Sequence, residues 1–125
     1  MELNLKVIEI PLNIVILSIT GSVKAGYLAP LEDEFKKLYQ GPPVKLILNV
    51  QGIQSIDSSG ISELIKARNF IVERGGKVAL VGIHSRVEMM IKMSGLDNYF
   101  PVLSTESDAI HLLKEPPAES AKSTL

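Results

Sequence analysis

The chain has 125 residues, of which 46% are hydrophobic and 22% are charged, a composition typical of one soluble domain with an apolar core. A net charge of -1, without a lysine or arginine cluster, disfavours nucleic-acid binding. The absence of cysteine excludes disulfides, thiolate catalysis and cysteine-ligated zinc, and is compatible with a reducing compartment. No apolar run approaches the ~20 residues that cross a membrane, and no signal-peptide pattern opens the chain, so we expect a cytoplasmic protein.

The first forty residues predict two strands and a helix. Apolar residues alternate over residues 3–7, and a second apolar run covers residues 14–19. The interruption at residues 11–13, Pro-Leu-Asn, indicates a short turn, so we expect an antiparallel strand pair. Residues 28–38 then carry apolar side chains at helical spacing, with Pro30 acceptable because it falls in the first turn.

The rest of the chain alternates between strands and helices. We expect strands at residues 44–50, 77–81 and 99–103, and helices at residues 58–74, 85–94 and 104–113. Ser85 and Glu88 have the spacing of a capping box, and Ser104 or Thr105 is expected to open the last helix. From Glu115 onward small, polar and proline residues replace apolar ones, which predicts a domain of residues 1–114 and a disordered tail of residues 115–125.

This order of elements predicts an α/β fold. We expect a single domain with a mostly parallel, mixed sheet of four to five strands, about four helices and an N-terminal antiparallel strand pair. In such sheets the functional loops lie at the carboxyl ends of the strands. Residues 51–59 and 82–85 are expected to form two of these loops.

The most informative stretch is residues 56–61, Ile-Asp-Ser-Ser-Gly-Ile, between a buried strand and an amphipathic helix. The serines fall at a helix N-terminus, where unpaired N–H groups and the helix dipole favour a hydroxyl oxygen or a bound or covalent anion. Capping alone is the alternative, because Asp and Ser are preferred N-caps and Gly is common in loops. Two adjacent serines exceed what one cap needs, and neither has the Glu or Gln of a capping box.

Over about residues 5–113 the chain resembles the STAS domain family, and within it the stand-alone anti-sigma-factor antagonists. Residues 55–61 are similar to the family's phosphorylation motif, Asp-Ser-Ser/Thr-Gly-Leu. Residues 93–96, Met-Ser-Gly-Leu, are similar to the end of the family's third helix, and residues 75–77, Gly-Gly-Lys, to the turn before a strand. Residues 104–109, Ser-Thr-Glu-Ser-Asp-Ala, match the family's run into the last helix.

The resemblance implies the STAS fold and a partner-switching role in transcription regulation. In that scheme the unmodified antagonist sequesters an anti-sigma factor, which is also an ATP-dependent serine kinase, and thereby releases a sigma factor. Phosphorylation of the serine after the aspartate, here Ser58, breaks the complex, and a separate serine phosphatase resets it. The resemblance implies a phosphoprotein that acts by protein binding, with no enzyme activity and no cofactor.

One position departs from the family pattern. After the second strand the family usually has Gly-Glu-Leu/Ile-Asp, whereas this chain has Gly-Ser-Val-Lys at residues 21–24. A lysine beside Ser58 would pair with a phosphate, weaken its repulsion of a partner or select a different partner. The alternative is that Lys24 is an exposed loop cation without a role, because surface pairs are usually weak.

We expect the partner-binding surface to combine this loop, the serine corner and the exposed side of the following helix. Its expected members are Lys24, Asp57, Ser58, Ser59, Gly60, Ser62 and Glu63, with Lys66, Arg68 and Asn69 as weaker candidates. Arg68 falls within the spacing of the apolar stripe, so its charged end is expected to reach outward from that stripe.

Two other functions stay open. The first is a non-switching STAS interaction subunit of a stressosome-like or membrane transport complex, which the base at Lys24 favours. The second is an enzyme in which His84, at the same predicted sheet edge, reaches Ser58; the chain has none of the usual serine-nucleophile or phosphate-loop motifs. His84 and His111 have no metal-ligand spacing, so we expect surface or helix-end histidines and no metal site.

Overall fold

The computed structural model describes residues 1–9, 13–95 and 98–114. Most of the turn predicted at residues 11–13 and the whole tail predicted at residues 115–125 therefore lie outside the described residues. Within the described ranges the strands are β1 (Glu2–Glu9), β2 (Ile14–Val23), β3 (Lys45–Ile56), β4 (Lys77–Val81) and β5 (Val102–Leu103), and the helices are α1 (Ala29–Tyr39), α2 (Ser58–Glu73), α3 (Ser85–Ser94) and α4 (Glu106–Lys114).

The strands form one mixed sheet in the order β1-β2-β3-β4-β5. The pair β1 and β2 is antiparallel, and β2 to β5 run parallel to one another. This arrangement confirms the predicted α/β class and the N-terminal antiparallel pair. It also brings the carboxyl ends of β2, β3 and β4 to the same end of the sheet. Parallel sheets place their functional loops at this end.

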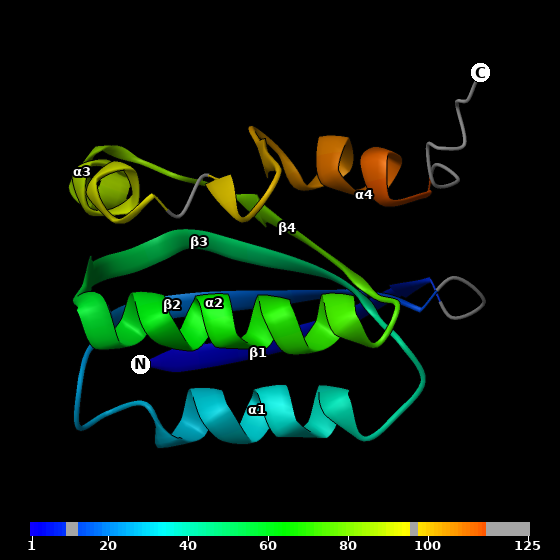
Figure 1. Cartoon of the computed structure of the whole chain (residues 1–125). Helices are drawn as coiled ribbons and strands as arrows, with labels where there is room; N and C mark the ends of the chain where they lie inside the picture. The colour runs from blue at the N-terminus through cyan, green and yellow to red at the C-terminus, as the bar shows by residue number, and fades with distance from the viewer. Residues whose placement is uncertain (10–12, 96–97, 115–125) are drawn as a thin grey trace.

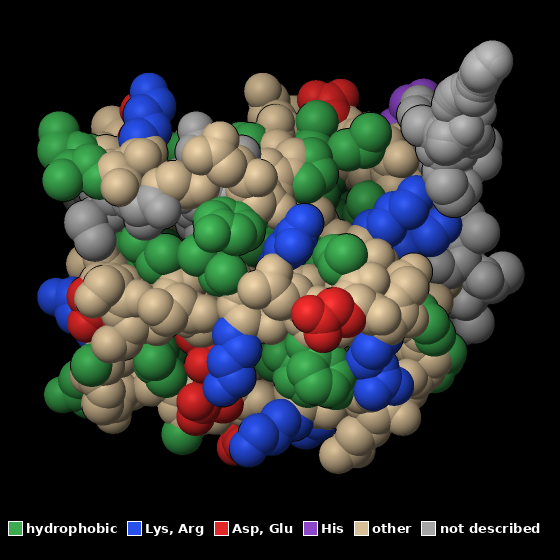
Figure 2. All heavy atoms as spheres, viewed as in Figure 1, with side chains coloured by type: hydrophobic (Ala, Val, Ile, Leu, Met, Phe, Trp, Pro, Cys, Tyr) green, Lys and Arg blue, Asp and Glu red, His purple; other side chains and the backbone are tan. Residues whose placement is uncertain are grey.

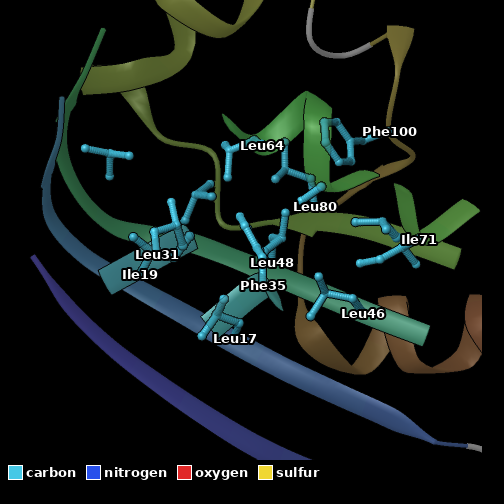
Figure 3. Packing of buried hydrophobic residues seen from close by; sticks show 14 of the residues in the cluster. Leu17, Ile19, Leu31, Phe35, Leu46, Leu48, Leu64, Ile71, Leu80 and Phe100 are labelled. Carbon is cyan, nitrogen blue, oxygen red and sulfur yellow. The ribbon is translucent and has the colours of Figure 1, made fainter. Parts of the chain in front are cut away.

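Apolar side chains line both faces of the sheet. Alternate residues of β2 point to opposite faces: Leu17 and Ile19 pack into the larger core with α1 and α2, while Ile14 and Ile16 pack into a smaller core with α4. Figure 3 shows the larger core, in which Leu31 and Phe35 of α1 and Leu46 and Leu48 of β3 come together with Leu64 and Ile71 of α2. Each fully buried side chain of this kind contributes roughly 1.5–3 kcal/mol to folding.

The starts of α3 and α4 test two of the predicted helix caps. In Figure 1 the first turn of α2 and helix α3 lie at the same end of the molecule, at the left. Helix α3 begins at Ser85, and its Glu88 N–H bonds the His84 carbonyl at 2.8 Å. The predicted capping box is therefore wrong: Ser85 lies inside the helix, and the Glu88 carboxylate pairs with Lys92 at 3.0 Å. At α4 the prediction is confirmed, because Thr105 Oγ1 accepts a hydrogen bond from the Asp108 N–H at 3.0 Å.

Strands β2 and β3 run further than predicted. They pair as far as Val23 and Ile56, with register shifts along the way, so the loop predicted at residues 51–59 is wrong over residues 51–56. Ile53 and Ile56 are buried in the larger core, while Gln51 and Gln54 are exposed. Burial of these two isoleucines stabilises the extension of β3. Gly52 does not end it, because the lack of a side chain allows close approach to Thr20, whose Oγ1 would lie 2.8 Å from an added Cβ.

Candidate functional site

The corner between β3 and α2 is built around the Asp57 carboxylate. Asp57 has an extended backbone, with φ -107° and ψ -176°, and α2 begins at the next residue. Its Oδ1 accepts a hydrogen bond from the Gly60 N–H at 3.0 Å, which satisfies one of the unpaired donors of the first helical turn. Its Oδ2 accepts a hydrogen bond from the Ala25 N–H at 3.0 Å. Asp57 is therefore the N-cap of α2 and also a link to the loop after β2.

These hydrogen bonds lower the pKa of Asp57 below its usual value. The Ala25 N–H has the largest effect, followed by the Gly60 N–H, and the Ser59 N–H and the Lys24 charge add to it. Because the folded-state pKa lies below the unfolded one, the carboxylate stabilises the fold above the ordinary aspartate pKa. This contribution is lost as the pH falls through the folded-state pKa. At neutral pH Asp57 is a fixed anion beside Ser58.

Gly60 allows α2 to approach the end of β2. A Cβ at this position would lie 2.3 Å from the Val23 carbonyl oxygen and 2.8 Å from Ile56 Cγ1, so no other residue fits without a shift of the backbone. The sequence places Gly60 among the partner-binding residues, but the structure buries it. Gly60 therefore contributes to packing, and its neighbours form the surface of the corner.

The two serines occupy the first two positions of α2 and differ in exposure. Ser58 is exposed and Ser59 is half-buried. The N–H groups of a first turn have no partner inside the helix, so the Ser58 hydroxyl stands where a negative charge is stabilised. This is the location that the sequence predicts for Ser58, an exposed hydroxyl on the opening turn of an α-helix.

The loop after β2 forms the second wall of the corner. The Tyr27 N–H bonds the Lys24 carbonyl at 3.0 Å, and Gly26 in this turn has a φ of +89°, a conformation that favours glycine. Lys24 is exposed, and it follows Val23, whose carbonyl accepts the Asp57 N–H at 3.3 Å. Where β2 and β3 end, the Ser55 hydroxyl donates a hydrogen bond to the Ser22 hydroxyl at 3.0 Å. The structure therefore brings the predicted Lys24 to the corner that holds Asp57 and Ser58.

Tyr27 is a candidate that the sequence analysis does not include. Its side chain is 70% exposed, in the loop held by Asp57, and exposed aromatic side chains are common anchors of protein interfaces. The available signal was a single aromatic residue in a segment of loop-forming residues before a helix. Tyr27 precedes the helix predicted at residues 28–38, so the sequence assigns this ring to a loop.

Glu63 corrects the sequence prediction. It is expected at an exposed, partner-facing position, but its exposure is 6% and it lies among the buried residues of α2. It shares this stripe with Gly60, Leu64 and Ala67, and the small residues on either side admit a longer side chain between α2 and α1. Burial, above all, raises the pKa of Glu63, and the nearby Glu32 raises it further, whereas Lys66 and Lys36 oppose the shift.

The outer side of α2 carries the remaining candidates. Ser62, Lys66 and Asn69 line one open groove of about 390 Å³ together with Ile65, Phe70 and Glu73. Arg68 does not belong to this groove. Its Nε donates to the Tyr99 carbonyl at 2.9 Å and its side chain also reaches Asn69 Oδ1 at 3.0 Å, so Arg68 joins α2 to the segment before β5.

Charged side chains of both signs are mixed over α1 and α2 on the face in Figure 2. His84 Nε2 lies 2.9 Å from the Ile53 carbonyl oxygen, and His111 is exposed in the last turn of α4. Among residues 1–9, 13–95 and 98–114 no three His, Cys, Asp or Glu side chains come close enough to bind a metal ion. Over the same ranges no helix is long and apolar enough to cross a membrane.

Named proteins and solved structures both include chains that are similar to this one. An anti-sigma F factor antagonist from Paenibacillus polymyxa is 28% identical over 65 residues, which are 52% of this chain and 56% of that protein. The match therefore spans about half the length of this relative. An anti-sigma factor antagonist from Mycobacterium paratuberculosis superposes with a TM-score of 0.78 at 19% identity, over 91% of this chain and 94% of the other.

The two further structures have different contexts. The Bacillus cell fate determinant SpoIIAA in its phosphorylated form has a TM-score of 0.69 at 17% identity, over 90% of this chain and 100% of that one. The murine anion transporter Slc26a9 has a TM-score of 0.71 at 20% identity, over 82% of this chain and 18% of the transporter. At these identities the likeness to solved structures establishes the fold alone.

The family is established by a different comparison. The model of the STAS domain matches residues 6–109, which include all of β2 to β5 and the Asp57 corner. Together with the mixed five-stranded sheet described above, this match means that the chain belongs to the STAS domain family.

Proposed function

We propose that this chain is an anti-sigma-factor antagonist. In this proposal it is a binding protein and not an enzyme, and it acts in the cytoplasm, where it sequesters an anti-sigma factor that has serine kinase activity. Phosphorylation of Ser58 ends the complex, and a serine phosphatase restores it. The observation that carries the proposal is the exposed Ser58 hydroxyl on the first turn of α2, next to the fixed Asp57 carboxylate. The similarity to an anti-sigma F factor antagonist from Paenibacillus polymyxa supports the same function.

The fold is expected to tolerate a phosphate on Ser58. A phosphoserine adds roughly -1.5 to -2 charges and three acceptor oxygens. At the N-terminus of α2 the helix dipole supports such a charge by about 0.3–2 kcal/mol. The exposed Lys24, in the loop that Asp57 holds, provides a nearby cation. The modified protein is therefore expected to stay folded.

The phosphate is expected to weaken the binding of the partner. Two like unit charges at ~5 Å and an effective dielectric of ~20 repel by roughly 3 kcal/mol, which corresponds to about 100-fold in affinity. Asp57 already places one negative charge at this surface, and Oδ1 and Oδ2 are both fixed by backbone donors. A partner with an acidic group opposite Ser58 would thus bind the unmodified form and release the phosphorylated one.

The test is to incubate the chain with ATP and the candidate anti-sigma factor kinases of its host, and to locate the phosphate by mass spectrometry. Ser107→Ala is a matched control, because Ser107 is also exposed in the first turn of a helix, α4, and lies outside the expected partner-binding surface. We expect Ser58→Ala to abolish incorporation and Ser107→Ala to leave it unchanged. Incorporation that persists in Ser58→Ala would contradict the assignment of the acceptor.

A second candidate function is a non-switching STAS subunit of a stressosome-like or membrane transport assembly. Lys24 at the corner favours it, because a cation beside Ser58 would offset the charge of a phosphate. The fold also occurs within the murine anion transporter, of which it covers 18%. This function predicts copurification with a larger assembly that Ser58→Asp does not disturb, whereas the antagonist function predicts that Ser58→Asp releases the partner.

A further inference from the structure

Strand β1 has an open outer edge. It is the first strand in the sheet order and pairs only with β2, and no other strand in the described ranges lies along its second edge. Such an edge presents a row of unpaired backbone N–H and C=O groups. Two apolar side chains lie along it, because Leu5 is 40% exposed and Val7 is 56% exposed. An edge with these properties is suited to pairing with another strand.

The side chains of β1 divide between the two faces of the sheet. Leu3, Leu5 and Val7 lie opposite the β2 residues whose side chains enter the larger core, on the side of α1 and α2. Glu2, Asn4 and Lys6 point to the other face and are exposed. Glu2 and Lys6 have opposite charges, and they are placed symmetrically about Asn4. This symmetry gives the strand a self-complementary sequence.

We infer that the outer edge of β1 pairs with β1 of a second copy of this chain, antiparallel and with Asn4 facing Asn4 across a two-fold axis. In this register Glu2 of each copy lies opposite Lys6 of the other, so that two opposite-charge pairs form on one face. Leu3 lies opposite Leu5 on the other face, and Met1 lies opposite Val7. The sheets of the two copies then form one continuous sheet, which covers the exposed Leu5 and Val7.

Other registers are less favourable. Only shifts by an even number of residues keep the apolar side chains of both copies on the same face. If one copy is shifted by two residues along the other, Lys6 lies opposite Asn4 instead of Glu2. The pairing then extends past Val7, where β1 has a register irregularity. A shift by four places Lys6 directly opposite Lys6, which is repulsive. The register centred on Asn4 uses the regular part of β1 and pairs both charges.

The first test uses the absence of cysteine from the chain, because one introduced thiol is then unique. Residues directly opposite each other in an antiparallel pair have Cβ atoms about 4.5–5.5 Å apart, near the range that disulfides span. We expect Asn4→Cys to form a covalent dimer under mild oxidation. Gln40→Cys, at the exposed C-terminal cap of α1, controls for random collision.

The second test exchanges the charges. Lys6→Glu places Glu opposite Glu2 in both pairs, and we expect the dimer dissociation constant from analytical ultracentrifugation to rise about tenfold. The double variant Glu2→Lys with Lys6→Glu restores both pairs and is expected to restore the dimer. Both changed residues, Glu2 and Lys6, are exposed, and circular dichroism checks that each variant is folded.

Two results would overturn the inference. One is a chain that is monomeric at high concentration and whose Asn4→Cys variant crosslinks no faster than Gln40→Cys. The other is a dimer that neither responds to Lys6→Glu nor crosslinks through position 4, because it would then use another surface. This inference does not depend on phosphorylation of Ser58, so each of the two proposals can fail without the other.

Discussion

At the scale of single residues, the corner depends on two positions with different tasks. Asp57 uses both carboxylate oxygens to hold backbone donors, one in α2 and one in the loop after β2. Gly60 contributes through the absence of a side chain, since the Val23 carbonyl occupies the space that a Cβ would need. The residue preferences of helix caps and loops allow Asp57 and Gly60 to be identified from the sequence. The reason for the glycine is a contact with β2, which only the structure reveals.

Gly60→Ala tests this packing directly. The added methyl group would meet the Val23 carbonyl oxygen at 2.3 Å, so we expect a loss of roughly 1–3 kcal/mol in the free energy of unfolding. Gly41→Ala is the matched control, because nothing lies within 4 Å of its added Cβ and no positive φ is involved. Urea unfolding of the two variants checks the prediction. Equal stabilities of the two variants would mean that α2 does not rest on the end of β2 as described.

At the scale of elements, the contact between α1 and α2 is the least predictable part of the site region. Helical spacing correctly predicts the burial of Leu31 and Phe35 in α1 and of Leu64 and Ile71 in α2. It also includes Val72 in the stripe of α2, and this residue is exposed. It does not predict the burial of Glu63, since a charged residue in a helix is usually solvated and its environment comes from a different helix. The ends of β2 and β3 were also beyond the sequence pattern, because their pairing continues through irregular register steps.

The polar side chains between these helices influence one another. Burial raises the pKa of Tyr39 to about 12, and the charge of Glu63 adds to the shift. The Tyr39 ring stacks on Phe70 with a centroid distance of 4.1 Å, and the Arg74 guanidinium lies 5.5 Å from the Phe70 ring centroid. Tyr39 therefore stays neutral and Glu63 is easier to protonate than an ordinary glutamate.

Glu63→Gln tests the effect of this burial on stability. Because the folded-state pKa of Glu63 is raised, the carboxyl favours folding most when it is protonated. This contribution is lost as the pH rises through the folded-state pKa. We expect the Tm of the wild type to fall relative to that of Glu63→Gln as the pH rises above the ordinary glutamate pKa of about 4.3. Glu73→Gln, exposed on the same helix, is the control and should follow the wild type.

A Glu63→Gln variant whose Tm tracks the wild type at every pH would contradict the burial of this carboxyl between the helices. A variant that becomes less stable at neutral pH would mean that the ion pair with Lys66, at an Nζ to Oε1 distance of 4.0 Å, outweighs the cost of burial. Thermal unfolding monitored by circular dichroism distinguishes these results.

At the scale of the whole molecule, the sheet determines what the corner can do. The order β1-β2-β3-β4-β5 places the ends of β2 and β3 side by side, and so brings Lys24 to Asp57 although the two are far apart in sequence. The sequence predicts the order of elements, the fold class and the exposed position of Ser58, because each follows from local periodicity and capping. Two of the predicted neighbours of Ser58, Gly60 and Glu63, are buried instead of exposed, and the exposed Tyr27 is not predicted at all. Long-range packing decides those positions.

The central claim is that a phosphate on Ser58 controls binding while the fold stays intact. The most direct measurement is the affinity of an anti-sigma factor from the host for the unmodified and the Ser58-phosphorylated chain, together with the Tm of both forms. We predict an affinity loss of about 100-fold or more with little change in Tm. Equal affinities of the two forms, with the phosphate confirmed on Ser58, would contradict the account.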